Sequence, residues 1–502
     1  MKIDRLKNSK RNMFYGVLYR LCLTILPFIN RTALINVLGA EYLGLNSLFT
    51  SILNILNLAE LGFGSAVVYS MYRPIAEGDN ETICALLNFY RKVYRAIGCL
   101  IFAVGCFALA FIDKLIAGDV PGDINLRIIF FIQLLNVVFS YFFLAYKTSI
   151  LSAYQREDVI SRISTVTMVL QYFTQIAIVV LTRNYYLYLA VLPICTILNN
   201  LLKAIEAKRL YPRIICEGTI NQKTQGDVLI KVKALLLHKI GGVVANSLDN
   251  IVISSFMGLV AIAIYNNYWY VYSSVCYFIA IFHTSVTAGL GNSIALETKA
   301  QNYEKFTKLN FINSWIVGWC ACCMMCMYQP FMRLWVGAAY MYPIGIVILF
   351  VFYFYINMSR RTVITFKDAA GIWVEDRFKP IVSAIVNVIL NVILIKLVGI
   401  AGVVISTIIS FMAVEIPWET SVLFKCYFKT SSVKYYMNQI KYGVLWCGII
   451  ALTYSICNIL PNNDWVKLIG SGMICTIVPN AIIAVVFRRN MRYVVAYLKG
   501  KK

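Results

Sequence analysis

The sequence predicts an all-α polytopic membrane protein of about fourteen transmembrane helices. The chain has 502 residues, of which 60% are hydrophobic, against about 45–50% in soluble domains, and its mean hydropathy is +0.72. Only 14% of the residues are charged, and they cluster between apolar runs of about 20 residues, each long enough to cross a hydrocarbon core. The predicted spans are residues 13–38, 42–70, 93–112, 124–146, 160–182, 185–206, 231–257, 260–292, 309–328, 341–358, 380–398, 401–424, 442–460 and 466–487.

The basic charge of the chain follows its predicted topology. With the N-terminus inside, 36 of the 46 Lys and Arg residues fall in or beside cytoplasmic segments and 5 lie at the outer side, which is the positive-inside distribution. We therefore expect a multi-pass protein of the cytoplasmic membrane with both termini in the cytoplasm. Because topology accounts for the net charge of +23, no nucleic-acid partner is expected. The five outer residues are Lys114, Arg183, Arg333, Lys396 and Lys467.

A weak internal repeat divides the chain into two similar halves. The turn after span one reads VLGAEYLGLN, with Gly39 and Asn46, and the turn after span seven reads FMGLVAIAIYN, with Gly258 and Asn266. Six spans separate the two turns, so both halves share one topology and form two six-helix lobes in a parallel pseudo-two-fold repeat, a recurring transporter architecture. The predicted domains are an N-terminal lobe (1–210), a cytoplasmic linker (211–230), a C-terminal lobe (231–430), and two extra helices with a basic tail (431–502).

Three basic residues lie well inside predicted spans one and seven. A charge in lipid costs about 2.5–3.5 kcal/mol on insertion scales, so such residues usually face a cavity. Arg20 and Arg31 in span one are eleven residues apart, which is about three turns, and therefore share one face of the helix. Lys239 lies in span seven. We expect these side chains to line a cationic, hydrated cavity between the lobes; the alternative is that both arginines extend to the headgroups.

Acids within the spans are candidates for ion coupling. Asp249 lies near the middle of span seven, Glu60 in span two and Glu415 in span twelve. A buried carboxylate that changes protonation, or that binds Na⁺, could couple transport to a proton or sodium gradient. For Asp249 the alternative is a structural ion pair with Lys239 or Arg31.

Amide side chains follow helix faces in several spans. Asn54 and Asn57 lie in span two, Asn136 in span four and Asn246 in span seven. Amides in a membrane often join helices to one another by hydrogen bonds. They also bind sugar hydroxyl groups, so these four residues are candidate substrate-binding residues.

The cysteines give no metal-binding pattern. Four of the 15 cysteines, Cys320, Cys322, Cys323 and Cys326, form a CxCCxxC cluster. The cluster lies inside an apolar predicted helix and has no flanking His or acid, so no metal and no cofactor are expected from the sequence.

Two segments resemble a known family. The basic N-terminus before an Arg-bearing span, the LGAEYLGLN turn and the ELGFGSAVVYSMYRPIAEGD segment at residues 60–79 resemble polysaccharide-unit (Wzx-type) flippases of the multidrug/oligosaccharidyl-lipid/polysaccharide (MOP) exporter superfamily. The resemblance implies alternating access around a V-shaped cavity. It also implies a substrate of undecaprenyl-diphosphate carrying an oligosaccharide repeat unit, and a role in capsular or exopolysaccharide assembly beside a polymerase and other assembly proteins. In some relatives the two extra helices form a groove for the lipid tail.

Two alternative classes compete with this interpretation. A small-molecule or multidrug exporter of the same superfamily would have twelve spans and an acidic cavity. This chain has a net positive charge and two further predicted spans. A polysaccharide polymerase needs a large outer loop, and a glycosyltransferase needs paired acids on a soluble face. The predicted loops are short, and Glu375 and Asp376 have no further acidic partner in the sequence. We therefore expect a transporter and not an enzyme.

Overall fold

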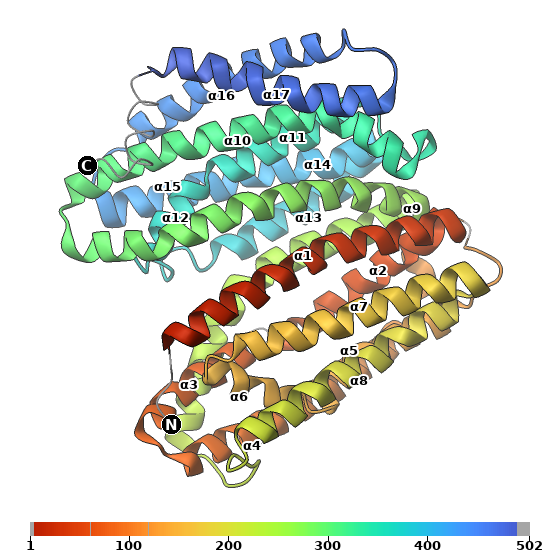
Figure 1. Cartoon of the computed structure of the whole chain (residues 1–502), viewed down its shortest axis with the longest axis vertical. Helices are drawn as coiled ribbons and strands as arrows, with labels where there is room; N and C mark the ends of the chain where they lie inside the picture. The colour runs from red at the N-terminus through yellow and green to blue at the C-terminus, as the bar shows by residue number, and fades with distance from the viewer. Residues whose placement is uncertain (1–4, 61, 119, 489–502) are drawn as a thin grey trace. The chain divides into compact units, whose positions relative to one another are not determined.

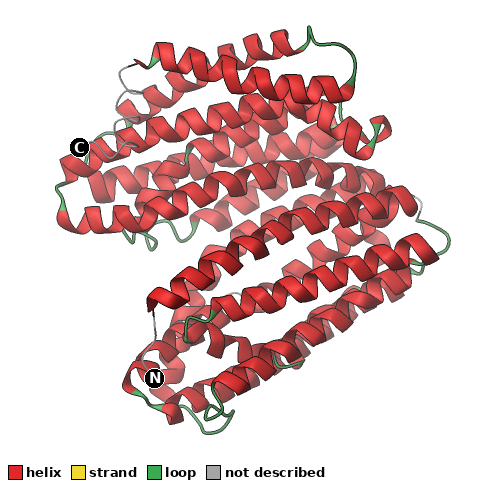
Figure 2. Ribbon diagram, viewed as in Figure 1, coloured by secondary structure: helices red, strands yellow, loops and turns green. Residues whose placement is uncertain are grey.

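The computed structural model describes residues 5–60, 62–118 and 120–488, and every regular element in these ranges is a helix (Figure 2). The chain forms two compact units, residues 1–263 and 264–502. The N-terminal residues 1–4 and the predicted basic tail at 489–502 lie outside the described residues, as do the side chains of Lys239 and Asn246 within a described helix. Figure 1 traces the helices in chain order, unit by unit.

The first unit contains eight helices and the start of a ninth. Helix α1 lies along α7, α7 lies along α8, and α5 packs on α8 (Figure 1). Side chains cap several of these helices, for example Asp79 at the start of α4 and Asn184 at the start of α8, as helix N-termini favour. The elements are α1 (Arg5–Val37), α2 (Ala40–Leu56), η1 (Asn57–Glu60), α3 (Phe63–Glu77), α4 (Asn80–Ala108), η2 (Ile112–Leu115), α5 (Leu126–Phe142), η3 (Ala145–Lys147), α6 (Thr148–Ala153), α7 (Glu157–Thr182), α8 (Tyr185–Leu210) and the start of α9 (Gln222–Leu296).

The second unit holds the end of α9 and all later helices. The long helix α10 packs against α11, α16 and α17, and α13 and α14 form a tight hairpin. A Cβ on Gly402 would lie 2.3 Å from the carbonyl oxygen of Leu394, so this hairpin needs a glycine. The elements are α10 (Lys299–Val336), η4 (Ala338–Tyr340), α11 (Ile344–Ser359), α12 (Arg361–Ala369), α13 (Lys379–Val398), α14 (Ile400–Ser410), the π-helical η5 (Phe411–Glu415), α15 (Ile416–Val422), the π-helical η6 (Leu423–Phe428), α16 (Val433–Cys457) and α17 (Asp464–Val486).

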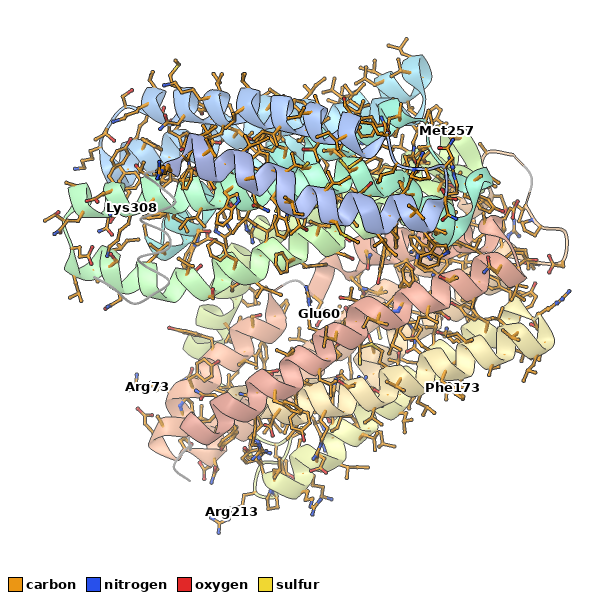
Figure 3. All side chains as sticks on the ribbon, turned by 45° about the horizontal axis from the view of Figure 1, so that its top comes forward. Glu60, Arg73, Phe173, Arg213, Met257 and Lys308 are labelled. Atoms are coloured by element: carbon orange, nitrogen blue, oxygen red, sulfur yellow. The ribbon has the colours of Figure 1, made fainter. Side chains whose placement is uncertain are left out.

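Large apolar side chains project outward from the helices. Phe173 and Leu181 on α7 are 73% and 81% exposed, and Leu397 on α13 is 71% exposed; Figure 3 shows Phe173 on the outer side of its helix. Water-soluble proteins rarely expose such contiguous apolar surface. These faces are suited to contact with lipid acyl chains, in agreement with the predicted membrane location.

The described helices do not reproduce all fourteen predicted spans. Ten helices are long and apolar enough to cross a membrane, or eleven if the bent pair of α5 with residues 145–153 is one span. Span two is broken into α2 and α3 by the turn at residues 57–62. Helix α4, which corresponds to span three and carries Arg91, Lys92 and Arg95, is not among the ten candidates.

Predicted spans seven and eight form one kinked helix, α9. Its candidate span of 50 residues has a summed helical length of about 75 Å, enough for two crossings of a hydrocarbon core of roughly 30 Å. Gly258 interrupts it with a positive φ of 81°, and a Cβ there would lie 2.6 Å from the carbonyl oxygen of Ala117. The kink separates the two predicted spans. Gly39, which the repeat aligns with Gly258, also has a positive φ, 114°.

The first half of α9 packs within the first unit. Asn250 donates a hydrogen bond to Ser51 on α2 (2.8 Å), and the carbonyl oxygen of Ser254 accepts from the backbone N–H of Ala117 (2.9 Å). The compact unit therefore extends to residue 263, beyond the predicted lobe boundary at residue 210. The division into lobes, linker and extra helices stays a prediction.

Candidate functional site

A carboxylate held by tyrosines lies in the first unit, where α2 ends. Glu60, labelled in Figure 3, accepts hydrogen bonds from the hydroxyl groups of Tyr94 on α4 and Tyr141 on α5, the latter at 2.7 Å. Tyr141 also donates to Asn57 (3.1 Å), and the ring of Tyr90 lies 4.3 Å from that of Tyr94. We call Asn57, Glu60, Tyr90, Tyr94 and Tyr141 the Glu60 cluster.

The backbone places Glu60 by ending one helix and starting another. The single turn η1 follows α2, and Gly62 then adopts a left-handed conformation with φ 101° before α3 begins. Tyr90 and Tyr94 are four residues apart on α4, so both point from one face of that helix. The tyrosine rings are largely buried, whereas Glu60 is half-buried.

The Glu60 cluster has the composition of a site for a proton or a small cation. Within the described part of the chain, Glu60 forms no ion pair with Lys, Arg or His, and its partners are hydroxyl groups. An acid in such a site can take up a proton, or offer carboxylate, amide and hydroxyl oxygens to a hard cation such as Na⁺. Glu60 is thus a predicted coupling acid whose described partners are tyrosine hydroxyl groups.

Arg20 and Arg31 both belong to α1. Arg20 is exposed and Arg31 is half-buried, and Arg31 lies close enough to Tyr188 on α8 to interact with it electrostatically. Their spacing of eleven residues keeps them on one face of α1. Pro27 lies between them, and the helix continues through it.

The other predicted residues of span seven are described in part. Asp249 is buried, at 4% exposure, and its neighbour Asn250 bonds to Ser51. Lys239 and Asn246 have side chains outside the described residues. Their predicted roles in substrate binding therefore stay predictions.

The predicted amides differ in what they contact. Asn54 is exposed on α2, whereas Asn57 belongs to the Glu60 cluster. Asn136 accepts a hydrogen bond from Thr196 (2.6 Å) and so joins α5 to α8. This last contact is the interhelical use of an amide that lipid favours.

Glu415, the third predicted coupling acid, lies in a charged network of the second unit. Arg360 Nη1 is 2.6 Å from Glu415 and 2.8 Å from Glu419. Ser383 also donates to Glu415 (3.0 Å). The network contains three basic and three acidic residues, and we call it the Arg360 network: Arg360, Lys367, Asp376, Lys379, Glu415 and Glu419.

Most of the Arg360 network was not among the predicted site residues. Arg360 lies between α11 and α12, Lys367 on α12, Asp376 in the loop before α13 and Lys379 at the start of α13. Glu415 ends the π-turn η5, and Glu419 lies on α15. The signal in the sequence is the i, i+4 spacing of Glu415 and Glu419 near the end of span twelve. The balanced charges make Glu415 a structural ion-pair partner in this conformation.

Solved structures share this fold. Lipid II flippase MurJ in an inward closed conformation aligns with a TM-score of 0.69 at 16% identity, over 95% of this chain and 100% of that chain. An inward-facing multidrug resistance MATE family transporter of the MOP superfamily aligns with a TM-score of 0.64 at 15% identity, over 81% of this chain and 96% of that chain. A Vibrio cholerae MATE transporter aligns at 0.57 and 12% identity, over 84% and 96%.

The chain therefore has the all-helical fold of MOP-type membrane transporters, and the matched proteins are a flippase and transporters, not enzymes. No protein-family model matches the sequence, and no curated protein matches it. The comparisons thus confirm the predicted type of fold, and membership of the predicted superfamily stays a prediction.

Proposed function

We propose that this chain is a flippase that translocates undecaprenyl-diphosphate-linked oligosaccharide repeat units across the cytoplasmic membrane by alternating access. Such units serve capsular or exopolysaccharide assembly, where a polymerase and other assembly proteins are the expected partners. Three observations support the proposal. They are the fold likeness to MurJ, the charge pattern of α1, and the resemblance of residues 38–46 and 60–79 to polysaccharide-unit flippases.

The observation that carries the proposal is the share of this chain that aligns with the lipid II flippase, which is 95%. The unmatched 5% of this chain is fewer residues than α16 and α17 contain together. The MurJ likeness therefore extends into these C-terminal helices. The MATE transporter matches 81% of the chain, a share that leaves room to omit both helices. A lipid-linked substrate accounts for helices that a water-soluble substrate does not require.

The diphosphate is the part of this substrate that α1 suits. Arginine guanidinium groups bind phosphate oxygens through paired, charge-assisted hydrogen bonds. Arg20 and Arg31 supply two such groups on one helix face, and Lys239 supplies a third cation in the proposal. Amides such as Asn54, Asn136 and Asn246 would meet sugar hydroxyls, and Asn57 would do so from within the Glu60 cluster.

Turnover needs a driving force, and the Glu60 cluster supplies the coupling group in this proposal. Entry of a proton or Na⁺ at Glu60 changes the charge of a site formed by η1, α4 and α5. A bound ion that prefers one conformation shifts the population toward that conformation. Asp249 is a second candidate for this role. Glu415 is a third, provided that its ion pair with Arg360 opens during the cycle.

A multidrug exporter is the second candidate, favoured by the MATE likeness and by the Glu60 cluster. A carboxylate surrounded by aromatic hydroxyls also suits an organic cation. The two candidates differ in the substrate that moves.

Reconstituted protein separates these candidates. Proteoliposomes would receive a fluorescent polyprenyl-diphosphate oligosaccharide, with a membrane-impermeant quencher reporting the exposed leaflet, and in parallel an ethidium efflux assay. If the chain is a flippase, the protein should decrease the fraction of fluorescent lipid that the quencher cannot reach. Ethidium should not move. Ethidium movement without lipid translocation would establish the exporter instead.

A further inference from the structure

Three buried cysteines converge in the second unit. Cys322 and Cys326 are one turn apart on α10, and Cys475 comes from α17. Their Sγ atoms all lie within 4.8 Å of one another, and their exposures are 0%, 5% and 0%. Cys457 on α16 packs in the same cluster. We call Cys322, Cys326 and Cys475 the thiol triad.

A cavity leads from the surface to this triad. It has a volume of about 130 Å³, and Cys326 and Cys457 form part of its wall. Because a water molecule takes about 30 Å³ of liquid volume, several waters or a hydrated ion fit. Arg333, Asp464 and Lys467 line the same cavity, and these residues belong to the predicted outer side of the membrane. The triad is thus buried but adjoins a polar entry path.

We propose that the thiol triad binds a soft monovalent metal ion, with Cu(I) as its best-fitting occupant. Thiolate ligands select Cu(I), Zn²⁺ and iron–sulfur clusters over hard cations. A structural zinc site needs four ligands in a tetrahedron, whereas the triad offers three. Metal–sulfur bonds of about 2.3 Å in a trigonal plane place the sulfurs about 4 Å apart, so the observed spacing needs only small side-chain rotations.

The binding step is an exchange of protons for metal without electron transfer. Each of the three S–H bonds breaks, three S–Cu bonds form, and three protons leave through the cavity to water. The resulting complex carries two negative charges. Arg333 pairs with Asp464 at 3.3 Å, so Lys467 leaves the cavity wall with one net positive charge, which offsets half of the charge of the complex.

Metal binding here would join α17 to α10. The sequence cluster CxCCxxC supplies two of the ligands, while its other members, Cys320 and Cys323, are not in the triad. The third ligand lies about 150 residues away in the chain, which is why the cluster alone predicts no metal. The alternative is that the thiols pack as small apolar side chains and bind nothing.

The experiment uses the full-length protein, purified in detergent under argon with a phosphine reductant. Protein is incubated with Cu(I) in the presence of the competing chelator bicinchoninate, desalted, and its copper measured by mass spectrometry. The proposal expects one copper per chain for the wild type and none for Cys322→Ser with Cys475→Ser. The matched control, Cys99→Ser with Cys447→Ser, removes two exposed thiols and is expected to retain the copper.

Two measurements on the wild type remain decisive even if the double variant fails to fold. X-ray absorption at the copper edge should show about three sulfur neighbours near 2.3 Å, and Cu(I) should raise the unfolding temperature while Mg²⁺ does not. Equal copper in the wild type and a folded Cys322→Ser, Cys475→Ser variant, nitrogen or oxygen neighbours around copper, or a disulfide between α10 and α17 after anaerobic purification would each overturn the proposal.

Discussion

Arg360 Nη1 lies 2.6 Å from Oε2 of Glu415, within the second unit. The side chains of this pair are 10% and 15% exposed, and the guanidinium also lies 4.5 Å from the centre of the Phe411 ring. Breaking a buried ion pair by removing one partner leaves the other charge buried and unpaired. The Arg360 network is therefore a point where single substitutions should have large effects.

We predict that Arg360→Met destabilises the protein by about 3–5 kcal/mol. The change leaves Lys379 to pair with both Glu415 and Glu419, so one buried carboxylate charge of the network is no longer balanced. The measurement is the unfolding temperature in detergent, read by size-exclusion fluorescence. Arg73→Met is the matched control, because Arg73 pairs with Glu77 at 2.8 Å with both side chains exposed and should cost about 0–1 kcal/mol. Equal shifts for the two variants would contradict the assignment of a buried network.

We predict that Gly318→Ala loosens the packing of α16 on α10. A Cβ at Gly318 would lie 1.9 Å from the indole of Trp446, which is 2% exposed, and overpacking a buried site costs about 1–3 kcal/mol. Gly448→Ala, on α16 with nothing within 4 Å of its new Cβ, is the control. The cost of Gly318→Ala should shrink when Trp446 is also changed to Leu; an undiminished cost in that double-mutant cycle would argue against the contact.

We predict that Glu60→Gln uncouples transport from the ion gradient while the fold is kept. Glutamine is close in shape: its amide oxygen can accept from one tyrosine hydroxyl and its NH2 group can donate to the oxygen of the other, so stability should change little. Loss of the carboxylate charge should weaken ion binding by about 1.5–3 kcal/mol, a factor of about 10 to 100. The measurement compares the translocation rate in proteoliposomes with and without an imposed proton or sodium gradient.

The control for this prediction is Glu77→Gln, an exposed acid at the end of α3. It should keep the gradient dependence. A Glu60→Gln protein that responds to the gradient as the wild type does would remove the coupling role and leave the cluster a structural one.

Much of the fold could be predicted from the sequence, but little of the candidate site. Long apolar runs mark α7, α8, α13, α16 and α17 as spans, because a helix that crosses a hydrocarbon core needs about 20 predominantly apolar residues. Breaks within apolar runs were not predictable from hydropathy. Span two breaks where Gly62 adopts a φ of 101°, and the Glu60 carboxylate beside this break bonds to tyrosines 34 and 81 residues away.

The same reason limits the prediction of site residues. Glu60 was recognisable as an acid in a span, but its tyrosine partners come from α4 and α5 and carry no local signal. Glu415 was recognisable too, whereas its pairing with Arg360 requires η5 to meet the junction between α11 and α12. Cys475 has no cysteine beside it in the sequence, so the thiol triad emerges only when α17 packs on α10.

The most direct test of the proposed function is translocation by a variant that lacks both arginines of α1. Each arginine–phosphate contact is worth about 1.5–3 kcal/mol, so Arg20→Ala with Arg31→Ala should slow flipping of a fluorescent polyprenyl-diphosphate oligosaccharide by at least about tenfold. Arg73→Ala with Arg209→Ala removes the same charge from exposed positions and should flip at the wild-type rate. Undiminished flipping by the α1 double variant would contradict the account.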